Sequence, residues 1–102
     1  MGLLVDLFNS IGSKKIDENS SEKDLGKFAK SKDENIRQEV AEHENCTLEL
    51  SELLSKDENE YVRKAVAENP KCSKEILELL KDDEEEWVYT EALKKLVKLN
   101  PN

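Results

Sequence analysis

The stretch EYVRKAVAENPKCSKEILELL, from Glu60 to Leu80, aligns without a gap onto ENIRQEVAEHENCTLELSELL, from Glu34 to Leu54. Ten of the 21 aligned positions are identical, and the offset between the copies is 60 − 34 = 26 positions. Self-similarity at a fixed period of this size is typical of proteins built from stacked structural repeats. The two copies therefore predict the architecture before any single residue indicates a function.

Within each copy the apolar residues have helical spacing. Val62, Val66 and Ala67 lie at i, i+4 and i+5, and a second apolar cluster fills residues 76–80. Pro70 separates the two halves, because proline cannot continue the first helix and restricts the residue before it. Each unit therefore reads as helix, tight turn, helix and polar loop.

The columns of this repeat, which hold residues one period apart, extend beyond the two copies. One column holds small hydroxyl residues suited to helix N-caps, and three more hold apolar residues. The chain thus contains a degraded unit before the copies and a modified half-unit after them, about three repeats in all. The columns are Ser21/Thr47/Ser73, Phe28/Leu54/Leu80, Ile36/Val62/Val88 and Ala41/Ala67/Leu93.

The expected fold is all-α, and the expected helices follow from these columns and the two ends. The Asn-Pro step of Asn69-Pro70 recurs at Asn100-Pro101, which is later than one repeat period would place it. The last helix is therefore expected to be longer than its equivalents, as befits a terminal cap. We predict helices near residues 2–11, 22–31, 35–43, 48–55, 61–68, 74–81 and 86–99.

The chain divides into three segments. Residues 1–12 carry apolar side chains at i, i+1, i+4, i+5 and i+8, which predicts a short amphipathic helix. Residues 13–20 are polar and predict a linker, and residues 21–102 form the repeat domain. The N-terminal helix has two readings: it caps the first unit, or it docks on another chain and mediates self-association.

Composition narrows the class of partner. With 102 residues and a net charge of −8, the chain is one domain without the basic face that nucleic-acid binding needs. Anionic membranes are disfavoured for the same reason, so the charge indicates either a basic partner or plain solubility. No apolar run reaches the ~20 residues of a membrane span, and the N-terminus is a poor secretory signal. A cytoplasmic location is expected.

The unit from Val62 to Glu84 resembles the leucine-rich repeat variant family of bacterial proteins. The matching features include Val62-Arg63, Ala-Val-Ala at residues 65–67, Asn69-Pro70 and the acidic pair at residues 82 and 83. The resemblance covers residues 21–88 and departs from the pattern at His43-Glu44, which replaces the Asn-Pro step. It implies a right-handed α-solenoid, a superhelix of about three two-helix repeats. The iron–sulfur segment of some relatives is not carried over, because no cysteine precedes Cys46.

The residues capable of chemistry do not form a catalytic or metal-binding set. Cys46 and Cys72 share one column, where stacked units place them roughly 8–10 Å apart, beyond the reach of a disulfide. Two free thiols are therefore expected. His43 is the single histidine and has no partner pattern for a metal or a triad. No enzyme activity, metal or cofactor is predicted.

Two columns supply the candidate protein-binding residues. Arg37 and Arg63 share a column with Tyr89, and they either bond the adjacent loop or form a basic ridge. Tyr61 and Trp87 share another, one residue before inward-facing valines, so they should point partly outward and lie side by side. Either these rings lie flat over neighbouring repeats, or they form an interaction surface.

Two function hypotheses follow. The first is a non-enzymatic protein–protein interaction module built on a helical-repeat scaffold. The second is a small acidic inhibitor or immunity-type protein that mimics nucleic acid and blocks a basic surface. Binding by a mimic should weaken steeply as salt rises, whereas an aromatic interface should not.

Overall fold

The structure, a computed structural model, describes residues 16–99 and is all-helical, with no strand in that range. The prediction of an all-α fold is confirmed. The helices begin at their predicted starts or one position earlier, and the helix expected at residues 2–11 lies outside the described range. They are α2 (Glu22–Phe28), α3 (Glu34–Glu42), α4 (Leu48–Leu54), α5 (Glu60–Glu68), α6 (Lys74–Leu80) and α7 (Glu86–Leu99).

Helix α2 ends earlier than the predicted residue 31. The N–H groups of Lys30 and Ser31 donate to the carbonyls of Lys27 and Phe28, at 3.1 and 3.0 Å, so the chain tightens after Phe28 and leaves the α-helical ladder. Tightening of the last turn in this way satisfies carbonyls that the helix leaves free.

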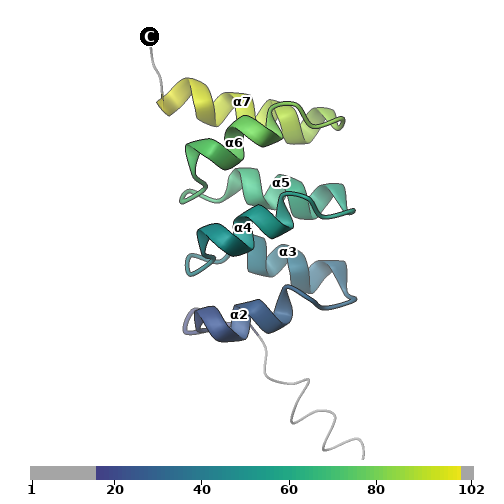
Figure 1. Ribbon diagram of the computed structural model, residues 1–102, viewed down its shortest axis with the longest axis vertical. Helices are drawn as coiled ribbons and strands as arrows, with labels where there is room; N and C mark the ends of the chain where they lie inside the picture. The colour runs from purple at the N-terminus through teal and green to yellow at the C-terminus, as the bar shows by residue number, and fades with distance from the viewer. Residues whose placement is uncertain (1–15, 100–102) are drawn as a thin grey trace, which may run out of the picture.

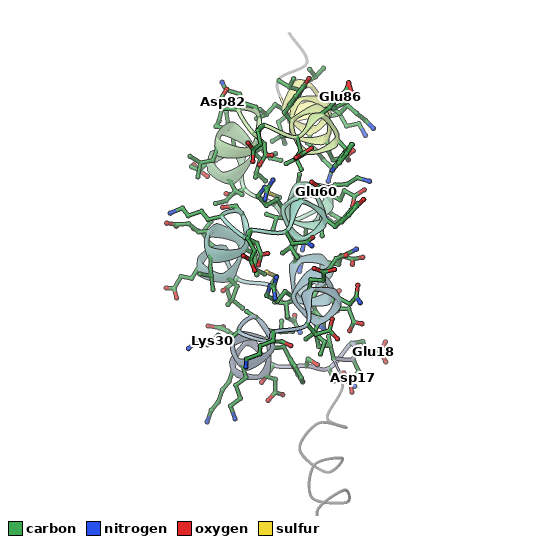
Figure 2. The ribbon with its side chains drawn as sticks, turned by 90° about the vertical axis from the view of Figure 1, so that its right-hand side faces the viewer. Asp17, Glu18, Lys30, Glu60, Asp82 and Glu86 are labelled. Atoms are coloured by element: carbon green, nitrogen blue, oxygen red, sulfur yellow. The ribbon has the colours of Figure 1, made fainter. Side chains whose placement is uncertain are left out.

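The helices stack one above another from α2 to α7 (Figure 1). Seen end on, they form two columns, with α2, α4 and α6 in one and α3, α5 and α7 in the other (Figure 2). Helix α5 packs directly against both α3 and α7, so the second column is continuous. The helices of the first column are short and equal in length, and each packs mainly on its chain neighbours.

The short helices begin where the hydroxyl column predicts. The hydroxyls of Ser21, Thr47 and Ser73 each accept a backbone N–H from the first turn of the helix that follows, at 3.1, 3.2 and 3.2 Å. An N-cap of this kind satisfies one of the N–H groups that a helix start leaves free. The three predicted N-caps are confirmed.

The core runs the length of the stack and follows the repeat columns. Val66, for example, is 1% exposed, as expected for a residue between α5 and its neighbours. A single continuous apolar cluster joins the units, because one helix pair cannot bury its own apolar face. Its largest fully buried side chains are Leu25, Val40, Leu54, Val62, Val66, Leu77 and Val88.

A set of equivalent turns follows helices α3 and α5 and precedes α2. Asp17 Oδ1, His43 Nδ1 and Asn69 Oδ1 accept the backbone N–H groups of Asn19, Asn45 and Lys71, at 2.9, 3.0 and 2.9 Å. The three acceptors occupy one column of the repeat. The imidazole therefore builds the same local turn as an Asx side chain, and the turn at His43-Glu44 does not depart from the pattern in this respect.

The same side chains tie each unit to the one before it. His43 Nε2 lies 2.6 Å from the carbonyl of Asp17, and because Nδ1 accepts a hydrogen bond, Nε2 carries the proton and donates. Asn69 Nδ2 donates to the carbonyls of Ala41 and His43, at 2.8 and 3.0 Å, and Lys95 Nζ donates to that of Glu68 at 2.7 Å. We call this series the turn ladder.

The turn ladder also anchors part of the segment expected to be a linker. Ile16 packs against the core, Ser20 is buried, and the carbonyl of Ser20 accepts from Asn45 Nδ2 at 3.0 Å. Residues 16–20 thus occupy the place that a preceding turn would take in the repeat.

Candidate functional site

Tyr61 and Trp87 form an exposed stacked pair. Their ring centroids are 6.4 Å apart and their planes differ by 7°, within the range of favourable aromatic pairs. Tyr61 is 54% exposed and Trp87 43% exposed, so neither ring is covered by the core. Because each is the second residue of its helix, α5 or α7, the repeat itself aligns them. The prediction that the rings lie side by side is confirmed.

Carboxylates surround this pair in the sequence. Residues 58–61 read Glu-Asn-Glu-Tyr, and residues 84–87 read Glu-Glu-Glu-Trp, with no lysine or arginine in either segment. We call these two segments together the aromatic edge. Figure 2 shows Glu60 and Glu86 one above the other at the N-terminal ends of α5 and α7. The equivalent residues of the first unit, 32–35, read Lys-Asp-Glu-Asn and carry no ring.

The two steps of the stack differ at the position that Asn59 and Glu85 share in the repeat. Between α3 and α5, the amide of Asn59 donates to the carboxylate of Glu34 at 2.8 Å. Between α5 and α7, Glu85 stands in place of that asparagine, and its carboxyl group meets Glu60. Burial, and then the charge and hydrogen bonding of Glu60, raise the pKa of the Glu85 carboxyl. Two facing carboxylates that both ionise repel each other.

The two arginines of the column form hydrogen bonds within the chain. Arg37 Nε and Nη2 donate to the two oxygens of Asp57, at 2.8 and 3.1 Å, and Nη1 donates to the carbonyl of Ser31 at 2.8 Å. Arg63 repeats the arrangement with Asp83, at 2.8 and 3.2 Å, and with the carbonyl of Asp57, at 2.7 Å. We call this series the arginine ladder.

The arginine ladder links the loop before each helix to the loop of the next unit. The side chains of Arg63 and Asp83 are only 11% and 9% exposed, and hydrogen bonding to the aspartate raises the pKa of Arg63 above its usual value. All three bonding nitrogens of each guanidinium are thus committed to intramolecular partners. Tyr89 holds the third position of the column and is half-buried. Of the five predicted binding residues, Tyr61 and Trp87 present the exposed surface.

Both cysteines are free thiols and are half-buried. Burial raises the pKa of Cys46, and it raises the pKa of Cys72 to about 11. A thiol with so high a pKa is a weak nucleophile at neutral pH, because the thiolate is the reactive form. Between residues 16 and 99, no three histidine, cysteine, aspartate or glutamate side chains are placed to hold a metal ion together.

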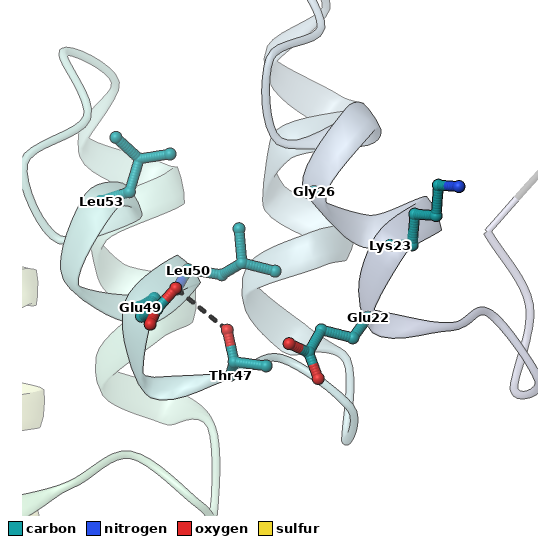
Figure 3. Close-up of a pocket in the computed structure, with 7 residues that line it drawn as sticks. All are labelled: Glu22, Lys23, Gly26, Thr47, Glu49, Leu50 and Leu53. Atoms are coloured by element: carbon teal, nitrogen blue, oxygen red, sulfur yellow. Dashed lines mark hydrogen bonds between the residues drawn. The ribbon is translucent and has the colours of Figure 1, made fainter.

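A groove between α2 and α4 is a second surface feature, and the sequence interpretation missed it. It has a volume of about 540 Å³ and is lined by Glu22, Lys23, Gly26, Thr47, Glu49, Leu50 and Leu53. Figure 3 shows Leu50 directed from α4 toward α2, where Gly26 carries no side chain. A Cβ at Gly26 would meet nothing within 4 Å. One unit later the equivalent residue is Glu52, so the next step of the stack lacks this glycine.

The outer face of α7 is a third feature. Leu93 is 44% exposed, although its column partners Ala41 and Ala67 are buried. A groove of about 410 Å³ is lined there by Thr90, Leu93, Lys94, Val97 and Lys98. No further helix follows α7 within the described part of the chain.

No helix between residues 16 and 99 combines the length and apolar character that a membrane crossing requires. Comparison with known proteins adds no assignment: no family model, curated protein or solved structure matches the chain. The resemblance to the leucine-rich repeat variant family therefore remains a prediction from the pattern of residues 21–88.

Proposed function

We propose that this chain is a non-enzymatic protein-binding module, a short right-handed α-solenoid of about three two-helix repeats that presents an aromatic surface to a partner. The observation that carries the proposal is the exposed stack of Tyr61 and Trp87. Tyrosine and tryptophan are enriched among the residues that dominate binding energy at protein interfaces. Neighbouring exposed aromatics are also unusual on a monomeric surface that has no partner.

The scaffold supports this role. The rings lie on two helices that pack directly together, and these helices are also linked by the bond of Arg63 to Asp83 and by that of Lys95 to the carbonyl of Glu68. A binding residue held by packed elements loses little conformational freedom when a partner arrives. The two helices that carry the rings are therefore packed and bonded together without a partner.

Site-specific photocrosslinking tests the proposal. A photoreactive phenylalanine analogue replaces Tyr61, and in a matched control it replaces Asn35, the exposed residue of the same column in the first unit. We expect a discrete protein adduct from position 61, lost when Trp87→Ala is added, and no such adduct from position 35. Adducts that are equal at both positions, or absent at 61, contradict the proposal.

Thermal melting of Trp87→Ala separates binding from folding. Truncation of a buried aromatic costs about 3–5 kcal/mol, and Trp87 is too exposed for a loss of that size. We expect nearly unchanged melting together with weakened association. A large drop in melting temperature would show that the ring is part of the core rather than a binding surface.

The second hypothesis, an acidic mimic of nucleic acid, predicts a different pattern. Such a mimic would bind through the whole acidic surface, so its association would fall steeply between low and high salt and would persist in Trp87→Ala. An association that is lost in Trp87→Ala favours the interaction module instead.

A further inference from the structure

The aromatic edge combines exposed ring faces with a cluster of carboxylates. A cationic group can interact favourably with both features, whereas a neutral or acidic group cannot. The rings of the edge offer exposed faces, whose quadrupole attracts cations. Its carboxylates, five within residues 58–61 and 84–87, surround those rings without a lysine or arginine in either segment. Two basic residues that follow the first segment are already paired: Arg63 with Asp83 at 2.8 Å, and Lys64 with Glu68 at 3.8 Å.

Helix capping does not explain all of these acids. Carboxylates in a first helical turn are stabilised by the helix dipole, and Glu60 and Glu86 fit that role. Glu85 does not, because its carboxyl group occupies the position that holds an amide donor in the previous unit. The same fold accommodates an asparagine one unit earlier, where Asn59 donates to Glu34. A donor supplied from outside would satisfy the pair of glutamates as the amide satisfies Glu34.

We propose that the aromatic edge binds an arginine-bearing peptide segment of the partner protein, with a guanidinium laid on the Tyr61–Trp87 stack and hydrogen-bonded by Glu60 and Glu85. The inference rests on the protein-binding function proposed above and adds the chemistry of the partner. Arginine fits better than lysine because its planar guanidinium stacks on aromatic faces and forms paired hydrogen bonds with carboxylates. Charge complementarity between the edge and the peptide is what selects this occupant.

A short synthetic Arg-Gly repeat peptide and its citrulline counterpart test the proposal with the full chain. Citrulline keeps the shape of arginine and removes the charge. Trp87 is the only tryptophan in the chain, so its fluorescence reports binding at the edge directly. We expect the arginine peptide to change this fluorescence saturably and the citrulline peptide to bind about tenfold more weakly or worse.

Matched variants separate the edge from general attraction to an acidic chain. Calorimetry should show that Trp87→Ala weakens the arginine peptide by about tenfold and that Glu60→Gln weakens it several-fold. Glu52→Gln removes the same charge from an exposed position on α4, in the other column, and should change affinity less than about twofold. Equal losses in Glu60→Gln and Glu52→Gln, or equal binding of the two peptides, would overturn the proposal.

The photocrosslinked adduct distinguishes this inference from the function on which it rests. If position 61 captures a protein whose crosslinked segment contains no arginine, and the arginine peptide does not bind, the binding function stands and the partner chemistry is wrong. If position 61 captures nothing and the peptide does not bind, both fail.

Discussion

Replacement of Asp83 by alanine breaks the second step of the arginine ladder and tests whether this ladder stabilises the stack. The carboxylate receives two bonds from Arg63, at 2.8 and 3.2 Å, and it accepts the N–H of Glu85 at 3.0 Å. The variant removes all three interactions. It leaves the largely buried Arg63 guanidinium with only the carbonyl of Asp57 as a partner.

The expected loss follows from burial and geometry. Breaking a fully buried ion pair costs about 3–5 kcal/mol, whereas exposed pairs contribute about 0–1 kcal/mol. The side chains of Arg63 and Asp83 are 11% and 9% exposed, and the pairing is bidentate, so this pair lies near the buried limit. The loss of the turn bond adds about 1 kcal/mol. Because Arg63 retains one carbonyl partner, we expect Asp83→Ala to lower the free energy of unfolding by about 3 kcal/mol.

Urea unfolding followed by far-ultraviolet circular dichroism measures this loss. A double-mutant cycle with Arg63→Ala isolates the pair, and we expect a coupling energy of about 2 kcal/mol. The pair of Arg37 and Asp57 has nearly the same distances, so its own cycle should agree. The exposed pair of Glu78 and Lys81 is the control, and Glu78→Ala should leave the midpoint unchanged within error. A coupling energy below about 0.5 kcal/mol would show that the pair contributes no more than an exposed ion pair, and would refute the view that the ladder stabilises the stack.

Four further outcomes are expected. Val66→Asp should abolish cooperative unfolding, because it places an unpaired carboxylate at a site that is 1% exposed, and a melt like that of the parent would show the assigned register is wrong. Gly26→Ala should raise stability by about 0.5–1 kcal/mol in urea unfolding, since the new methyl meets no atom within 4 Å, and a loss would show that the groove closes in solution. The folded state holds the Glu85 proton more tightly than the unfolded chain, so destabilisation develops as pH rises above the ordinary carboxyl range. Glu85→Gln, which removes the charge and keeps the size of the side chain, should therefore raise the melting temperature at neutral pH and have no such effect at acidic pH. Thiol titration should count two thiols after denaturation without reductant, with Cys72 slow to alkylate in the native state at mildly alkaline pH, whereas a Cys46–Cys72 crosslink would contradict the stacking geometry.

The helices could be predicted because several signals agree at each boundary. At Ser73, for example, the hydroxyl column, the breaker at Pro70 and the apolar run that follows all indicate the start of α6, and the helix begins at the next residue. The end of α2 could not be predicted in the same way. Its own residues carry no breaker, and only the repeat marks the boundary: Phe28 shares a column with Leu54 and Leu80, where α4 and α6 end with the same i+3 hydrogen bonds.

The candidate site was only partly visible in the sequence. The shared column predicted that Tyr61 and Trp87 would be neighbours, because equivalent positions in stacked units lie together. The role of His43 could not be predicted, because the equivalence of histidine and asparagine emerges only when the structure shows each accepting the N–H of the residue two positions later. The partner of Glu85 was obscured for a similar reason. Its contact with Glu60, which lies in the preceding unit, depends on rotamers, and columns of residue types do not encode rotamers.

The two ladders restrict which changes in chain length keep their hydrogen-bond partners matched. Each ladder repeats with the period of the sequence, so removal of the segment 34–59, which is one whole period, would leave every rung still matched. Arg63 would then meet the carbonyl of Ser31, as Arg37 now does, and Asn69 would meet that of Asp17, as His43 now does. A deletion one position shorter or longer would turn the downstream helix by about 100°. Donors would then be separated from their acceptors in the arginine ladder and in the turn ladder. The matched register also holds when a second copy of segment 34–59 is inserted, which keeps the chain above the roughly three repeats that stability needs. We expect this lengthened chain to melt cooperatively and its off-register neighbours to lose that transition, so changes of length in this protein should be tolerated only in whole units.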